Sequence, residues 1–256
     1  MKHTLILTTI LTGSFFIAAA QQSAKPEDTE IYEPVPKIVT PGKMPGAAPS
    51  DAIILFGGDN LDHWVSNKDT TAAAGWIVAD HIITVNKAAG DIQTRRRFMD
   101  FQLHAEYRIP TNITGSGQAR GNSGIFLAAL PWGAGGYELQ VLDNFNNKTY
   151  VNGQVGSIYK QSVPLANAAL PPGDWQTYDV VWTAPRFNDD GTVKSPARVT
   201  VFHNGVLVQN NFELRGDTPY IGQPAYRKHG PSPIKLQAHG DKSEPISYRN
   251  IWVREL

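Results

Sequence analysis

The chain has 256 residues, with 23 basic and 23 acidic side chains, no cysteine and 10% aromatic residues. Without cysteine it can form no disulfide, no thiolate zinc site and no thiol nucleophile. The balanced charge argues against a nucleic-acid-binding protein, which needs a basic surface, and 41% hydrophobic residues are typical of a globular chain.

The first 20 residues have the pattern of a secretory signal peptide. Lys2 gives a basic start, residues 5–20 are mainly apolar, and a run of three alanines ends at Ala20. The alternative is a membrane anchor, but the apolar run is shorter than the roughly 20 residues of a spanning helix. We therefore expect cleavage near Ala20 and a periplasmic or secreted protein that does not insert into a membrane.

Residues 21–50 contain six prolines and predict an N-terminal linker or a strap along the surface of a domain. Apolar side chains from Ile31 to Val39 favour docking of part of this segment. Globular patterning then continues from Asp51 to Leu256 without a second linker. The sequence therefore predicts one domain over residues 51–256.

The pattern beyond Asp51 is that of short strands. Residues 101–109 alternate apolar and polar side chains, so one face belongs to a core and the other carries His104, Glu106 and Arg108. Asn204-Gly205 between two β-rich runs is a strong hairpin signal, and residues 188–191 are typical of a longer hairpin loop. Further strands are expected at residues 76–78, 81–85, 124–130, 137–142, 175–183, 197–203, 206–208, 234–239 and 246–254. Because no capped helical stripe occurs, we predict an all-β fold, a sandwich or jelly roll of two antiparallel sheets.

Residues 137–143 carry the strongest candidate chemistry. On a strand, Glu138 and Gln140 share one face while Leu139 and Val141 point into the core. Asp143 joins Glu138 only if a bulge or turn intervenes. Two carboxylates are the minimum for glycoside hydrolysis. The alternative is that Glu138 lies on an ordinary solvated face and that Asp143 caps a turn.

Other segments supply candidate ligand-binding groups, each with a structural alternative as a turn or core residue. His239, at the end of a predicted strand, could shuttle a proton or be a hydrogen-bonded structural histidine. The candidates for binding a saccharide are Arg120, Asn122, Gln140, Gln154, Tyr159, Gln237, His104, Glu106 and Trp132. The seven histidines show no metal-ligand spacing, so we expect no metal and no cofactor.

Several motifs together resemble the 3-keto-disaccharide hydrolase family. They include Leu-Phe-Gly-Gly-Asp-Asn-Leu at residues 55–61, Gly-Asn-Ser-Gly-Ile-Phe at 121–126, residues 137–143, Leu-Gln-Ala-His-Gly at 236–240 and Tyr-Arg-Asn-Ile-Trp at 248–252. The resemblance spans residues 51–256 in order. It implies a concanavalin A-like β-sandwich, export from a bacterial cytoplasm and hydrolysis of glycosides oxidised at C3.

The resemblance also implies candidate catalytic roles. The Glu-x-Gln-x-x-Asp stretch is similar to the Glu-x-Asp-x-x-Glu strand of retaining glucanases on this fold, which points to Glu138 and Asp143. A 3-keto group acidifies the C2 proton, so the aglycone could instead leave by elimination, with Glu138 as base and His239 as acid or enolate stabiliser. Displacement and elimination both remain open. The main alternative is a non-catalytic, lectin-like glycan-binding module, and a third is a protein-interaction domain.

Overall fold

The computed structural model describes residues 24–132 and 135–256. The chain divides into two compact units, with the boundary between Ile38 and Val39. In the first unit, residues 24–38 contain one short 3₁₀ helix, η1 (Pro26–Thr29). The predicted signal peptide, residues 1–20, lies outside the described residues. Within the described ranges, no helix has the length and apolar character needed to cross a membrane.

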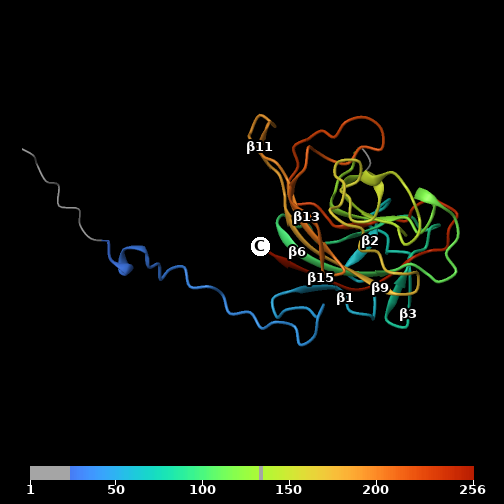
Figure 1. The fold of residues 1–256 in the computed structure, drawn as a ribbon, viewed down its shortest axis with the longest axis horizontal. Helices are drawn as coiled ribbons and strands as arrows, with labels where there is room; N and C mark the ends of the chain where they lie inside the picture. Colours follow the sequence, from blue (N-terminus) through green and yellow to red (C-terminus); the bar gives the residue numbers. More distant parts are fainter. Residues whose placement is uncertain (1–23, 133–134) are drawn as a thin grey trace, which may run out of the picture. The chain divides into compact units, whose positions relative to one another are not determined.

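The second unit contains a large antiparallel sheet of eight strands (Figure 1). Its order is β13-β12-β9-β6-β15-β4-β3, and β1 also pairs with β15. These strands are β1 (Ile53–Phe56), β3 (Ile77–Ala79), β4 (Ile82–Thr84), β6 (Phe101–Arg108), β9 (Trp175–Thr183), β12 (Arg198–His203), β13 (Val206–Glu213) and β15 (Ser247–Glu255).

A smaller antiparallel sheet of five strands has the order β2-β5-β14-β7-β8. Its strands are β2 (Trp64–Ser66), β5 (Ile92–Thr94), β14 (Lys235–Leu236), β7 (Ser123–Ala129) and β8 (Gly136–Val141). A two-stranded hairpin, β10 (Arg186–Phe187) and β11 (Val193–Ser195), and two 3₁₀ helices, η2 (Gly117–Ala119) and η3 (Val151–Gly153), complete the unit.

One hydrophobic core lies between the two sheets. The large sheet contributes Leu103 and Tyr107 from β6, and the small sheet contributes Ile125 and Leu139 from β7 and β8. All four side chains are at most 1% exposed. The predicted all-β sandwich of two antiparallel sheets is thus confirmed, and its core depends on the period-two pattern of the strands.

The predicted strands and turns agree with the structure where the sequence pattern was strongest. Strand β9 has the predicted limits, and Asn204 and Gly205 both have positive φ (51° and 77°), as a two-residue hairpin requires. The strand predicted at residues 234–239 is shorter, because only Lys235 and Leu236 stay in the ladder. Beyond them the N–H of Ala238 donates to Oδ1 of Asp91 rather than to a neighbouring strand (2.8 Å).

The second half of the Pro-rich segment packs on the sandwich. Residues 39–50 belong to the same unit as the sheets. The carbonyl of Gly46 accepts hydrogen bonds from Nδ2 of Asn250 (2.9 Å) and Nε1 of Trp252 (2.8 Å), both on β15. These contacts hold the strap against the outward face of the large sheet, on the far side from its core residues.

Candidate functional site

The small sheet presents a row of side chains that includes a lysine and a glutamate on the face that points away from the core. In register, Lys235 of β14 lies opposite Phe126 of β7, which lies opposite Glu138 of β8. Their sequence neighbours Leu236, Ile125 and Leu139 are core residues. Because strand side chains alternate, Gln140 shares the outward face with Glu138, as the sequence predicted.

This face contains a cavity of about 130 Å³. Its lining comes from β8, from the segments just before β7 and just after β14, and from two loops, and consists of Asn122, Glu138, Gln140, Tyr159, Tyr220, Gln237 and His239. Six of these seven residues were candidates from the sequence. The structure thus brings together one carboxyl group, one imidazole, three amides and two phenols.

Two loops reach the cavity along the free edge of β8. The N–H of Tyr159 donates to the carbonyl of Glu138 (3.1 Å), which places the Tyr159 ring beside that residue. Further along the same edge, the N–H of Glu138 donates to Oγ1 of Thr218 (3.0 Å), and the N–H of Thr218 donates to the carbonyl of Gly136 (2.9 Å). The second loop thereby positions Tyr220, which no sequence pattern had singled out.

Glu138 is a buried carboxyl group with an unusual pKa. The side chain is only 5% exposed, and its oxygens accept no hydrogen bond from any described residue. Burial raises the pKa of Glu138 to about 8; the charge of Lys235 opposes the rise and that of Asp91 adds to it. Glu138 is therefore mainly protonated at neutral pH and can donate a proton.

A glycine creates the space that Glu138 occupies. A Cβ atom on Gly124 would lie 2.6 Å from Oε1 of Glu138 and 3.1 Å from its Cγ. Gly124 sits opposite Gln140 in the β7–β8 ladder, and its φ is not positive. The glycine is needed here for close approach rather than for backbone conformation.

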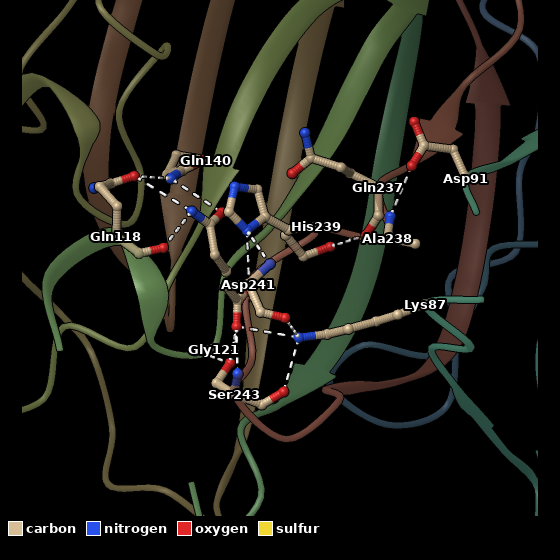
Figure 2. A network of polar contacts seen from close by, with 12 residues as sticks. Lys87, Asp91, Gln118, Gly121, Gln140, Gln237, Ala238, His239, Asp241 and Ser243 are labelled. Atoms are coloured by element: carbon tan, nitrogen blue, oxygen red, sulfur yellow. Dashed lines mark hydrogen bonds and ion pairs between the residues drawn. The ribbon is translucent and has the colours of Figure 1, made fainter. Parts of the chain in front are cut away.

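His239 is held by a buried aspartate (Figure 2). Its Nδ1 lies 2.8 Å from Oδ2 of Asp241, whose Oδ1 receives Nζ of Lys87 (3.1 Å) and the N–H of Ser243 (2.7 Å). Burial acts to raise the pKa of Asp241, but hydrogen bonds from Ser243, His239 and Lys87 outweigh it and lower that pKa. The backbone N–H of Asp241 also points at Nδ1 (3.3 Å), but the shorter contact with the ionised carboxylate favours the imidazole proton on Nδ1. Nε2 is then the acceptor, toward the side of Gln140 and Gln237 (Figure 2).

Two amide oxygens in the cavity have no hydrogen-bond partner among the described residues. These are Oε1 of Gln140 and Oε1 of Gln237, both buried. The amide nitrogen of Gln140 is used, since it donates to Oε1 of Gln118 (3.1 Å) and Oδ1 of Asn122 (3.4 Å). An unpaired buried acceptor costs free energy, so these oxygens fit a ligand that carries several hydroxyl donors.

Asp143 and Arg120 do not line this cavity. Nε of Arg120 lies 2.6 Å from Oδ2 of Asp143, whose side chain is only 1% exposed. The register shift in the β7–β8 pair lies between Phe126 and Ala129, so no bulge follows Glu138. Asp143 lies beyond the end of β8 at Val141, where it also accepts the N–H of Phe145 (3.0 Å). The geometry gives it a structural ion pair.

His104 and Glu106 lie on the large sheet, on the outward face of β6. His104 bonds to Oδ1 of Asp179 (2.7 Å) and stacks on Trp252, under the strap. Glu106 pairs with Arg249 (2.6 Å). The sequence correctly placed both residues on a non-core face of a strand. The alternation of apolar and polar residues does not show to which sheet that strand belongs, so it could not show whether they lie near Glu138.

Gln154 and Trp132 are also absent from the cavity lining. Gln154 lines a separate depression formed with Asn144, Asn147 and Lys148. Trp132 packs against the core, with the Arg227 guanidinium 5.9 Å from its ring centre. Neither side chain is therefore part of the site proposed below.

Several contributing residues were missed from the sequence. Asp241 and Ser243 follow His239 at spacings of two and four, a signal available in the loop but too common to stand alone. Lys87 lies more than 150 residues away from Asp241, and only the fold brings them together. No group of three or more histidine, aspartate or glutamate side chains in the described part of the chain is arranged to hold a metal ion; the expectation of no cofactor stays a prediction.

Comparisons with known proteins identify relatives. A family model described as a 3-keto-alpha-glucoside-1,2-lyase-like domain matches residues 51–254. A solved structure from Parabacteroides distasonis ATCC 8503, named as a candidate glycosyl hydrolase, is 53% identical, covers 96% of this chain and 100% of its own, and has a TM-score of 0.85. No curated protein matches the chain.

More distant structures support the fold alone. Two further candidate glycosyl hydrolases from the same organism are 19% and 20% identical, with TM-scores of 0.59 and 0.54. Both cover 80% of this chain, and the matches span 94% and 99% of their own lengths. Together with the family match, these findings confirm the resemblance noted in the sequence.

Proposed function

Because this chain belongs to the 3-keto-alpha-glucoside-1,2-lyase-like family, we propose that it cleaves the glycosidic bond of sugars oxidised at C3. The family and its named relatives give the protein a carbohydrate-active role. The observation that carries the finer proposal is one cavity holding a protonated carboxyl group, an aspartate-held histidine and unpaired amide oxygens. A lectin-like module would need the amide oxygens to bind a sugar but neither the protonated carboxyl group nor the aspartate-held histidine.

We propose an elimination in which His239 is the base and Glu138 the acid. The 3-keto group acidifies the proton on C2, and Nε2 of His239 accepts that proton. The electron pair of the C2–H bond forms the C1=C2 double bond, the C1–O bond breaks, and Glu138 donates its proton to the departing oxygen. Water can then add across C1=C2 to give net hydrolysis. These roles reverse the sequence-based hypothesis, because burial keeps Glu138 protonated.

The amides would bind the sugar ring. Oε1 of Gln140 and Oε1 of Gln237 accept hydrogen bonds from ring hydroxyls and so gain the partners that they lack. Asn122, which already bonds to the carbonyl of Gln118 (2.8 Å), fixes the orientation of the Gln140 amide. Sugar binding and proton transfer thus use different groups of one cavity.

A pair of substrates tests the proposed function. We expect turnover of a 3-keto-glucoside and none of the same glucoside with a C3 hydroxyl, because only the ketone acidifies C2–H. Deuterium at C2 should slow the first reaction if proton removal limits the rate. Binding of both compounds without turnover would instead support the lectin-like alternative, and equal turnover of both would rule out elimination.

The Gly124→Ala variant is expected to lose activity by about tenfold or more, since displacements of about 1 Å in a catalytic group have effects of this size or larger. The added Cβ would occupy the space of the Glu138 carboxyl. Initial rates and melting temperature provide the measurement. Gly230→Ala is the matched control, because a Cβ there meets no atom within 4 Å. Unchanged kinetics in Gly124→Ala would argue against a role for this carboxyl position.

The Asp241→Asn variant is expected to lower kcat by about 10- to 100-fold, the usual effect of removing a partner that orients a functional histidine, with little change in KM. Asparagine cannot supply the charge that fixes the proton on Nδ1. Nitrogen-15 NMR of the His239 ring should show loss of that tautomer. If the tautomer persists and kcat is unchanged, Asp241 has a structural role only.

We also propose that the protein is exported after cleavage of its signal peptide. The support is the sequence pattern of residues 1–20. Expression in a bacterial host followed by cell fractionation and mass spectrometry should give an extracytoplasmic chain that begins near Gln21. A cytoplasmic chain that retains Met1 or Lys2 would contradict export.

A further inference from the structure

Three tyrosines and a lysine form a rim at the border of the cavity. The hydroxyl of Tyr150 bonds to that of Tyr159, and Nζ of Lys160 lies 5.5 Å from the Tyr159 ring centre and 4.6 Å from that of Tyr220. Lys160 also donates to the carbonyl of Tyr220. These contacts fix the Tyr220 ring at the mouth of the cavity, so the rim is held in place before a ligand arrives.

A second depression begins at Tyr220. It has a volume of about 370 Å³, within the range of small-molecule sites, and shares Tyr220 with the cavity. Its two most exposed large apolar side chains are Tyr220 (69% exposed) and Ile221 (86% exposed). Gln223 and Arg227, which also line it, are exposed polar side chains, whereas Asp217 and Thr218 are buried at 8% and 0% exposure. Adjacent large apolar side chains with such exposure are typical of a binding surface.

The depression is also connected to the catalytic acid. Thr218, which lines it, accepts the backbone N–H of Glu138 (3.0 Å). The depression therefore lies beside β8 at the position of Glu138, the residue that protonates the leaving oxygen in the proposed reaction. The amide-lined cavity accommodates the sugar. The depression is then available to the group on the other side of the glycosidic oxygen.

We propose that the depression formed around Tyr220 and Ile221 is an aglycone subsite, and that it takes a planar aromatic aglycone. This inference rests on the proposed function and adds the substrate class. An aromatic ring can stack on Tyr220 and bury apolar area against Ile221, the two most exposed large apolar side chains that line the depression. The preferred substrates are then aryl or arylalkyl 3-keto-glycosides rather than disaccharides.

Binding of unreactive ligands tests the subsite without turnover. Isothermal titration calorimetry compares benzyl glucoside, methyl glucoside and a glucose disaccharide, all with a C3 hydroxyl. We expect benzyl glucoside to bind about tenfold more tightly than methyl glucoside, since the phenyl ring adds buried apolar area. The Ile221→Ser variant should reduce this advantage by about threefold or more and leave methyl glucoside binding unchanged.

The control is Ile77→Ser, the same substitution at an exposed position (56%) on β3 of the large sheet. It should leave both affinities unchanged. The proposal is overturned if benzyl and methyl glucosides bind equally, if the disaccharide binds more tightly than benzyl glucoside, or if Ile221→Ser leaves the benzyl advantage intact.

Turnover then separates this proposal from the proposed function. Benzyl and methyl 3-keto-glucosides have leaving groups of similar acidity, so a higher kcat/KM for the benzyl compound reports the subsite. If neither compound reacts but the binding advantage depends on Ile221, the proposed chemistry fails and the aromatic subsite stands. If both react at equal kcat/KM and bind equally, the chemistry stands and the aromatic subsite fails.

Discussion

Replacing Glu138 with glutamine is expected to stabilise the protein at alkaline pH while removing its activity. Glu138 has a pKa of about 8 in the folded chain, against an ordinary value of 4.5. Between these values the folded state binds one more proton than the unfolded state, so stability falls as pH rises from about 4.5 to about 8. A glutamine at this position does not ionise, so the variant does not lose stability with rising pH through this group.

The size of the effect follows from the same two values. Each pKa unit corresponds to about 1.4 kcal/mol, so the wild type loses on the order of 4 kcal/mol between pH 4.5 and pH 9 through this one group. Urea unfolding of both proteins at pH 5 and pH 9 measures it. We expect similar free energies of unfolding at pH 5 and a more stable variant at pH 9.

Glu106→Gln is a control for which the opposite effect on stability at pH 9 is expected. Burial acts to raise the pKa of Glu106, but its hydrogen bonds to Asn250 and Arg249 and the positive charge of Arg249 outweigh burial and lower it. This substitution should therefore destabilise the protein at pH 9 and leave the cavity around Glu138 intact. A Glu138→Gln variant that is no more stable than wild type at pH 9 would show that Glu138 is not a buried neutral acid.

Activity should follow the same ionisation. In the wild type, kcat/KM is expected to fall above about pH 8, where Glu138 loses the proton that it donates. The Glu138→Gln variant should lose about 10²- to 10⁴-fold in kcat, the usual contribution of a general acid. The fall in rate above about pH 8 should be unchanged in Glu106→Gln and absent from the residual activity of Glu138→Gln. This result would assign the fall to ionisation of Glu138.

Replacing His239 with alanine is expected to stop exchange of the C2 hydrogen of a 3-keto-glucoside with deuterated water. His239 is the proposed base, held through Nδ1 by Asp241. The loss in kcat should again be about 10²- to 10⁴-fold, because both exchange and cleavage begin with proton removal. Proton NMR of the C2 position and release of the aglycone are measured in the same sample.

The two variants together separate the roles of acid and base. Glu138→Gln should still exchange the C2 hydrogen while releasing little aglycone, whereas His239→Ala should do neither. His63→Ala is the control, because that histidine is exposed and lies outside the cavity lining. If exchange persists in His239→Ala and stops in Glu138→Gln, then Glu138 is the base, as first inferred from the sequence.

The strand pattern predicted which face of β8 would bear the candidate site residues. It did not correctly predict every residue of that site. Leu139 in the core required Glu138 and Gln140 to share the outer face, and the structure places both in the cavity. For Asp143 the same alternation pointed to the opposite side unless a bulge or turn intervened. Strand β8 has no bulge after Glu138 and ends at Val141, and beyond its end Asp143 pairs with Arg120 outside the cavity lining.

The sequence by itself determined the sandwich, its hairpins, the family and the outward face of the strands, because these follow from local periodicity and ordered motifs. Tertiary structure alone decided which outward face carries the cavity and which loops complete it. It set the proton affinity of Glu138 by burial and oriented His239 through Asp241, with Lys87 supplied from more than 150 residues away. Proton affinity and orientation depend on through-space neighbours, which alternation along one strand does not specify.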